Sequence, residues 1–115
     1  MDKITHYRPA IHEVMQGLVK PNRQEQPQYE EYDTQLVMDD ERGHYYLVSV
    51  GWRGYQREHA ISVHIDVKGD KVWIQADWTD LILAEQLVEK GVPKEDIVLA
   101  FHAPYRRPYT GYAVA

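Results

Sequence analysis

The chain of 115 residues contains no cysteine. It can therefore form no disulfide framework, and it offers no thiolate as a nucleophile or as a zinc ligand. No apolar run approaches the ~20 residues of a membrane-spanning helix, and the opening MDKITHYRP lacks an apolar signal segment. These absences and the length lead us to expect one cytoplasmic domain, 1–115, with no membrane contact.

Positive charge is scarce, and it is not clustered. The net charge is −5, and residues 1–41 hold nine carboxylates against four Lys or Arg side chains. Affinity for nucleic acid comes mainly from clustered cations that displace counterions from phosphates. The charge distribution therefore argues against direct contact with nucleic acid. The sequence also has no phosphate-binding glycine loop and no dinucleotide motif, so we expect no cofactor.

The N-terminal segment has the apolar periodicity of an amphipathic helix. The residues on its apolar face are Ile4, Tyr7, Ile11, Val14 or Met15, and Leu18. Pro9 interrupts this pattern, because a proline inside a helix removes one backbone hydrogen bond and crowds the preceding turn. We expect the regular helix either to begin near Thr5 or His6 or to bend there.

A polar connection follows from Pro21 to Asp33. Its length and composition favour a mobile surface loop. The alternative is a recognition loop that presents Tyr29 and Tyr32 among acidic side chains, because tyrosines beside carboxylates suit a basic protein partner. The acidic side chains are Glu30, Glu31 and Asp33.

Alternating polarity then predicts an antiparallel sheet. Gln35–Met38 begins it, 39–43 forms a turn, and His44–Trp52 returns with Tyr46, Val48, Val50 and Trp52 on one face. The other face of this strand, with Tyr45, Leu47 and Ser49, is also rather apolar. Ile61–Asp77 reads as a hairpin around Gly69-Asp70. The expected pairs are Val67–Val72, Ile65–Ile74 and Val63–Ala76 on one face, and Asp66–Trp73 and His64–Gln75 on the other.

A second helix is predicted over Leu81–Lys90, with Thr79 or Asp80 as its N-cap. Gly91 fits the left-handed position after the helix, so that Val92 can fold back on Leu87. Pro104 and Pro108 favour an extended tail that is fastened by its aromatic residues while its arginines face water. The fold class is α+β: an N-terminal helix, a four-stranded antiparallel meander, a C-terminal helix and an extended tail, with both helices on one face of the sheet.

Five ordered segments carry a family resemblance. They are THYR (5–8), LVSVGW (47–52), VHIDVKGDKVWIQ (63–75), LVEKGVPKEDIVLAFH (87–102) and YTGYAVA (109–115). Through them the chain resembles the XisI family, the excision controlling factors of filamentous nitrogen-fixing cyanobacteria. The resemblance implies an accessory protein for programmed excision of a DNA element, beside a site-specific recombinase and a XisH-like partner. It implies no catalytic residue.

The tightest polar and aromatic group on the sheet is His64, Asp66, Trp73 and Gln75. His64 and Asp66 provide two possible metal ligands or a base with its orienting carboxylate, but neither a third ligand nor a nucleophile is identifiable. The predicted face also carries Tyr45 and Leu47, and this is more apolar surface than a monomer usually exposes. Burial of that face between two copies of the chain is the favoured interpretation.

Three hypotheses follow. The first is a non-enzymatic accessory protein that contacts a XisH-like partner through Tyr29, Tyr32 and the carboxylates of Glu30, Asp33 and 39–41. The second is a protein that binds DNA, perhaps single-stranded, through Arg53, Arg57, Arg106 and Arg107, the last two of which lie between Tyr105 and Tyr109. The third is a small enzyme centred on His64 and Asp66. The other histidines (His6, His12, His44, His59 and His102) are isolated in sequence and are expected to be structural or exposed.

Overall fold

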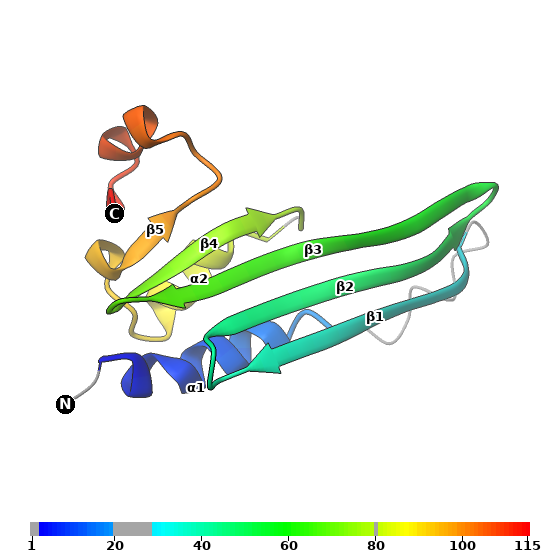
Figure 1. Cartoon of the computed structure of the whole chain (residues 1–115), viewed down its shortest axis with the longest axis horizontal. Helices are drawn as coiled ribbons and strands as arrows, with labels where there is room; N and C mark the ends of the chain where they lie inside the picture. Colours follow the sequence, from blue (N-terminus) through cyan, green and yellow to red (C-terminus); the bar gives the residue numbers. More distant parts are fainter. Residues whose placement is uncertain (1–2, 20–28, 80) are drawn as a thin grey trace.

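The computed structural model describes residues 3–19, 29–79 and 81–115, and the side chains from residue 31 in the second range. A five-stranded sheet has its strands in chain order: β1 (Tyr29–Asp39), β2 (His44–Arg53), β3 (Gln56–Lys68), β4 (Lys71–Asp77) and β5 (Ile97–Leu99). The helices are α1 (Lys3–Gln16) and α2 (Leu83–Glu89), with short 3-10 helices η2 (Lys94–Asp96) and η3 (Pro104–Tyr109). Figure 1 shows that β1, β2 and β3 extend well beyond β4 and β5.

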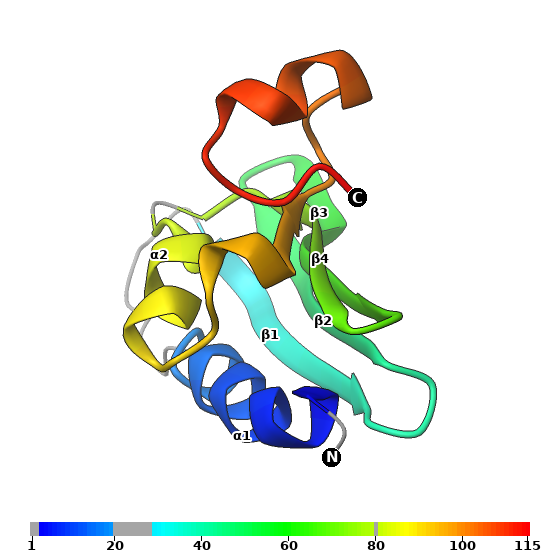
Figure 2. The same cartoon turned by 90° about the vertical axis from the view of Figure 1, so that its left-hand side faces the viewer.

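Both α-helices cover the same face of the sheet (Figure 2). The hydrophobic core lies between the two helices and the sheet. It contains Ile11 and Met15 from α1, Leu83 and Leu87 from α2, and alternate residues of the strands. The strand residues are Tyr45, Leu47, Val63, Ile65, Val72, Ile74 and Ile97. The predicted α+β class and meander are confirmed, and β5 adds a fifth strand parallel to β4.

Helix α1 begins at Lys3 and continues through Pro9, so the start predicted near Thr5 or His6 is wrong. Pro9 has no N–H to donate to the carbonyl of Thr5. The predicted apolar face is buried. Its packing against the sheet stabilises the helix although the hydrogen bond from residue 9 is absent. Polar contacts also fasten the helix: among them, the Tyr7 hydroxyl donates to Asp96, and Lys90 forms an ion pair of 2.9 Å with Glu13.

Strand β1 begins at Tyr29, six residues before the predicted start at Gln35. The loop interpretation of residues 29–33 is therefore wrong, while residues 20–28 lie outside the described part of the chain. An irregularity interrupts the pairing with β2 between Glu30 and Asp33, and Glu31 has a φ of 50°. Tyr32 is buried, with 5% of its surface exposed. It cannot serve as an exposed recognition residue in this conformation.

The two faces of β2 are the reverse of those predicted. Tyr45, Leu47 and Ser49 point toward the helices and are buried, while Tyr46, Val48 and Val50 lie on the other face. Both sets are apolar, so the alternation within β2 could not distinguish them. The neighbouring strand decides, because Tyr45 pairs with Ile65, whose side chain lies in the core.

The β3–β4 hairpin forms at the predicted turn, with Lys68 opposite Lys71. Asp66 pairs with Trp73 as expected, and the two predicted pairs nearest the turn on the core face, Val67–Val72 and Ile65–Ile74, are also correct. A bulge between His64 and Ile65 then shifts the register, so that His64 lies opposite Ala76 and Val63 opposite Asp77. The predicted pairs His64–Gln75 and Val63–Ala76 are wrong, because a bulge places two residues of one strand opposite one of the other.

Helix α2 is shorter than predicted, at Leu83–Glu89. Its N-cap residue is Ile82, and not Thr79. The Asp77 carboxylate accepts hydrogen bonds from the backbone amides of Leu83, the first helical residue, and of Thr79, at 3.2 and 3.1 Å. Asp80 lies outside the described residues. The predicted helix end is confirmed, since Val92 N–H donates to Leu87 O and Gly91 N–H to Val88 O, at 3.0 Å each.

The segment after β5, residues 100–115, is called the tail. It contains η3 and is therefore not extended as predicted. The residue that holds it is Arg107, whose guanidinium donates to the carbonyl oxygens of Ala100, His102 and Val114 at 3.2, 3.0 and 3.5 Å. Tyr105 and Tyr109, expected to fasten the tail, are 77% and 90% exposed. The predictions for Tyr105, Tyr109 and Arg107 are thus wrong, whereas Tyr112 packs against the core and Arg106 is exposed, as predicted.

Candidate functional site

The sheet face opposite the helices carries a polar cluster close to the β1–β2 and β3–β4 turns. Asp66 on β3 accepts hydrogen bonds at one carboxylate oxygen from His44 Nδ1 at 2.8 Å and from His64 Nε2 at 2.9 Å. Gln75 Nε2 donates to the other oxygen at 3.3 Å. The register creates this cluster, because His44 lies directly opposite Asp66 and Gln75 lies at the β3–β4 bulge.

The electrostatics of the cluster favour an ionised Asp66. Partial burial raises the pKa of the Asp66 carboxyl, but the hydrogen bonds and charges of His44 and His64 outweigh burial and leave it below its ordinary value. The Asp66 side chain is 14% exposed, whereas those of His44 and His64 are 43% and 29% exposed. A half-buried carboxylate is thus shared between two histidines that reach solvent.

Half-exposed apolar side chains surround this cluster, and we call the whole surface the open face. Its apolar members are Val37, Tyr46, Val48, Val50, Ile61 and Trp73. The Tyr46 ring lies edge-on to His64, with centroids 4.6 Å apart, and Val37 and Ile61 are 46% and 47% exposed. No described helix covers this face (Figure 2). It offers a continuous surface for another macromolecule.

Trp73 lies at the corner of the open face beside the tail. Lys68 Nζ lies 4.3 Å from the centroid of its ring, and the Arg107 guanidinium carbon lies 5.6 Å from it. Trp73 is therefore partly covered from within the chain, and it links the sheet to the tail.

The interface residues that were predicted on the sheet separate into two groups. His64, Asp66, Trp73 and Gln75 come together as predicted, while Tyr45 and Leu47 lie in the core and leave the candidate interface. His44 was predicted to be isolated and instead completes the cluster. Its signal in the sequence was its position next to Gly43, at the start of the strand that pairs with β3.

Some acidic side chains in residues 1–41 have partners within the chain, and others are exposed. Asp39 pairs with Arg42 at 3.2 Å, and Asp40 accepts hydrogen bonds from His12 at 2.7 Å and from the Tyr45 hydroxyl at 2.5 Å. Glu31, Asp33 and Glu41 are exposed. The side chains of Tyr29 and Glu30 lie outside the described set, so their predicted role stays a prediction.

The four arginines of the DNA-binding hypothesis lie in two separate places. Arg53 and Arg57 flank the β2–β3 turn, where Arg53 contacts Glu58 and Gln56 and Arg57 lies over Trp52. Arg106 and Arg107 lie in η3, at the opposite end of the long axis (Figure 1). The guanidinium of Arg107 is already used by three backbone carbonyls. The structure does not gather these side chains into one basic surface.

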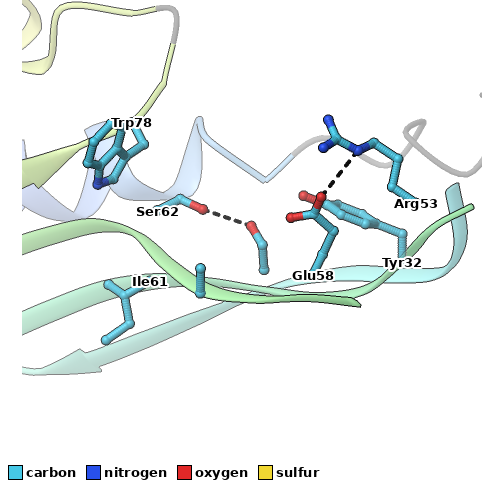
Figure 3. A pocket seen from close by; sticks show the side chains of 8 residues that line it. Tyr32, Arg53, Glu58, Ile61, Ser62 and Trp78 are labelled. Atoms are coloured by element: carbon cyan, nitrogen blue, oxygen red, sulfur yellow. Dashed lines mark hydrogen bonds and ion pairs between the residues drawn. The ribbon is translucent and has the colours of Figure 1, made fainter. Parts of the chain in front are cut away.

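A pocket of about 330 Å³ lies on the helix side of the long strands (Figure 3). Its polar groups pair with one another: Ser49 and Ser62 hydroxyls lie 2.8 Å apart, and Arg53 Nε lies 3.4 Å from Glu58. Trp78, 82% exposed, forms one wall. The sequence interpretation missed this pocket, because it depends on a register shift at which Ser62 has no partner on β2, while Ser49 pairs with Ala60. Among the described residues no histidine lines the pocket, and Glu58, the carboxylate in its lining, pairs with Arg53.

Within the described ranges, no group of three or more His, Cys, Asp or Glu side chains is arranged to hold a metal ion. Also within those ranges, no helix has the length and apolar character needed to cross a membrane.

Comparison with known proteins gives one consistent match. Residues 1–114 match the family described as XisI protein. A crystal structure of a XisI-like protein from Anabaena variabilis is similar, with 36% identity over 98% of this chain and 95% of that one, at a TM-score of 0.73. The fdxN element excision controlling factor XisI from the same organism has 31% identity over 99% and 100% of the two chains, at a TM-score of 0.79. No curated protein matches.

Proposed function

This chain belongs to the XisI family, and we propose that it is a controlling factor for excision of a DNA element that acts by protein contact and without catalysis. The family and the name of its structural relative support the excision role. A XisH-like protein from the same genome is the proposed partner, and through it a site-specific recombinase. The proposed action requires binding surfaces and no reaction centre.

The open face is the observation that carries this proposal. It combines half-exposed valines, an isoleucine and aromatic rings with the His44–Asp66–His64 cluster. An apolar centre with a few satisfied polar groups is typical of protein interfaces. We propose that this face joins two copies of the chain, because a self-complementary face is the commonest route to a dimer.

The exposed carboxylates at the start of β1 suit a basic partner. Glu31 and Asp33 are exposed, and Asp33 has only an exposed contact of 3.3 Å with Gln35. Asp39 and Asp40 are held by neighbouring side chains and contribute less. We expect the paired variant Glu31→Lys/Asp33→Lys to weaken partner binding, mainly at low salt, because exposed charges are screened. Unchanged affinity at low salt would remove this part of the proposal.

Size exclusion with light scattering tests the central claim, first on the chain alone and then on its mixture with the XisH-like protein. A stable mixed complex supports action by protein contact, whereas no complex between two folded proteins contradicts it.

The oligomeric state tests the open face with Val37→Lys and Ile61→Lys, since both side chains are nearly half exposed. We expect monomers from these variants. Tyr55→Lys is the control, because Tyr55 is fully exposed at the distant β2–β3 turn. Trp73 is a poorer probe, because its replacement also disturbs Arg107 and the tail. Dimers from Val37→Lys and Ile61→Lys would contradict self-association through this face.

A further inference from the structure

The tail is a fixed platform that projects from the corner of the sheet (Figures 1 and 2). Arg107 holds it through three backbone carbonyls and through the Trp73 ring. Ala113 N–H also donates to Ile97 O at 2.9 Å, which attaches the tail to β5. The outer surface of η3 is therefore presented in one orientation, and ligand binding there loses little conformational entropy.

That outer surface is aromatic and cationic. Tyr105 and Tyr109 are 77% and 90% exposed, and Arg106 between them is exposed. Among the described residues, the Arg106 guanidinium makes neither a hydrogen bond nor an ion pair. Tyrosine and arginine are the residue types that most often dominate binding energy at protein interfaces. None of the three stabilises the tail, so their exposure calls for another explanation.

A pocket of about 320 Å³ lies beside Arg106 and is lined by His102, Arg106, Tyr109 and Thr110. Thr110 Oγ1 is satisfied internally, since it donates to Arg107 O at 2.8 Å and accepts from Tyr112 N–H at 3.1 Å. The remaining groups can each donate a hydrogen bond, and no carboxylate of the described residues lines the pocket. This donor set is suited to an anion, and the planar guanidinium fits a carboxylate through two parallel hydrogen bonds.

A protein carboxylate fits this surface better than a nucleic acid does. Only one guanidinium is free here, Arg53 and Arg57 lie at the far end of the molecule, and the chain has a net charge of −5. Binding of a polyanion requires several cationic side chains, and the net negative charge of the chain repels it. A single Asp or Glu side chain within an aromatic interface requires only one cationic partner.

We infer that the tail is a docking surface for an Asp or Glu side chain of a protein partner, with Arg106 as the ligand of the carboxylate and Tyr105 and Tyr109 packed beside it. This inference rests on the proposed function, since the partner is the XisH-like protein. It assigns to the tail a second contact, separate from the acidic residues of β1.

The test measures dissociation constants of the XisH-like protein for the wild type, Arg106→Glu, Arg106→Lys and Tyr109→Ser. We expect Arg106→Glu to weaken binding at least about tenfold and Arg106→Lys to weaken it less, because lysine keeps the charge and loses the planar geometry. Arg42→Glu is the matched control for the change in charge: Arg42 is 70% exposed on the β1–β2 turn, and its reversal, which also frees Asp39, should not weaken binding. Thermal unfolding confirms that each variant is folded.

The outcomes separate the two claims. If the wild type binds and both Arg106→Glu and Tyr109→Ser bind equally well, the tail inference is wrong while the proposed function stands. If the folded wild type forms no complex, both the proposed function and the tail inference are wrong. A single-stranded 30-nucleotide DNA serves as a second probe. If Arg106→Glu loses DNA binding but keeps protein binding, the ligand of Arg106 is a nucleic-acid phosphate, and the inference of a protein carboxylate is wrong.

Discussion

The guanidinium of Arg107 lies over the indole of Trp73, with its carbon 5.6 Å from the ring centroid, and from there it reaches three backbone carbonyls of the tail. We expect Arg107→Ala to lower the free energy of unfolding by about 1–2 kcal/mol, because charge-assisted hydrogen bonds are lost. For a domain of this size that corresponds to a fall in Tm of roughly 4–8 °C.

Thermal unfolding measures this effect, and Arg106→Ala is the control because its side chain is exposed. Hydrogen exchange adds a local measure, since the Ala113 amide, which bonds to Ile97, should lose protection. Arg107→Lys should not restore stability, because an ammonium cannot reach three carbonyls in a plane. Equal Tm values for Arg107→Ala and the wild type would show that the tail is held by other contacts.

Gly51 lies where two strands approach closely. A Cβ there would lie 2.5 Å from Tyr32 Cα, and the φ of Gly51 is 149°. We expect Gly51→Ala to cost at least about 3 kcal/mol, because the clash is with backbone and β1 must move away from β2. The measurement is the urea midpoint. Gly54→Ala is the matched control: its φ is 62°, nothing lies within 4 Å of the added Cβ, and only about 1–2 kcal/mol of backbone strain is expected.

Acid stability should report the Asp66 cluster. The pKa of Asp66 is lowered in the folded protein, so its contribution is present above the unfolded pKa of about 4 and is lost as the pH falls through the folded value. We expect Asp66→Asn to be less stable than the wild type at pH 7, with a difference that shrinks below pH 4. Urea midpoints from pH 7 to pH 2.5 provide the measurement. A difference that stays constant over this range would contradict the linkage.

Tyr7 provides the corresponding prediction at high pH. Burial and the hydrogen bond to Asp96 raise the pKa of Tyr7 to about 12. A raised pKa means that the stability it contributes is complete below pH 10 and is lost as the pH rises through the folded value. We expect Tyr7→Phe to cost ~1–3 kcal/mol at pH 7, because Asp96 loses a partner in a buried site.

The loss of stability at high pH should also be smaller in Tyr7→Phe than in the wild type. Some of it remains, because burial and Asp40 likewise raise the pKa of Tyr45. Unfolding followed from pH 7 to pH 12 measures both effects, with the exposed Tyr105→Phe as the control. If the stability of Tyr7→Phe falls with rising pH as steeply as that of the wild type, ionisation of Tyr7 is not coupled to folding.

The sequence predicted features whose cause is local. The face of α1, the turn at Gly69 and the helix end at Gly91 each follow from periodicity or from a residue type that the backbone requires there. It failed where distant residues decide: both faces of β2 are apolar, and only pairing with Ile65 places Tyr45 inside. The His44–Asp66–His64 cluster depends on strand register in the same way.

The start of β1 and the role of Arg107 were missed for related reasons. Glu30, Glu31 and Asp33 have low strand propensity, and pairing with β2 makes this segment a strand despite that. Arg107 adjoins Arg106 in the sequence, and nothing in composition distinguishes a cation that binds backbone carbonyls from one that faces water. The contacts of the tail with Trp73, far away in the chain, provide the distinction.

The strand order has a kinetic consequence. Because the five strands follow one another in the sheet as they do in the chain, β1 to β4 can assemble by successive hairpins, each closing only a short loop. Helix α1 is different: its contact between Tyr7 and Asp96 spans 89 residues. On the ribosome, α1 is therefore made well before the segment that carries Asp96. The apolar side of α1 lacks part of its binding surface until that later segment has also been made, and a chaperone has most to protect during that interval.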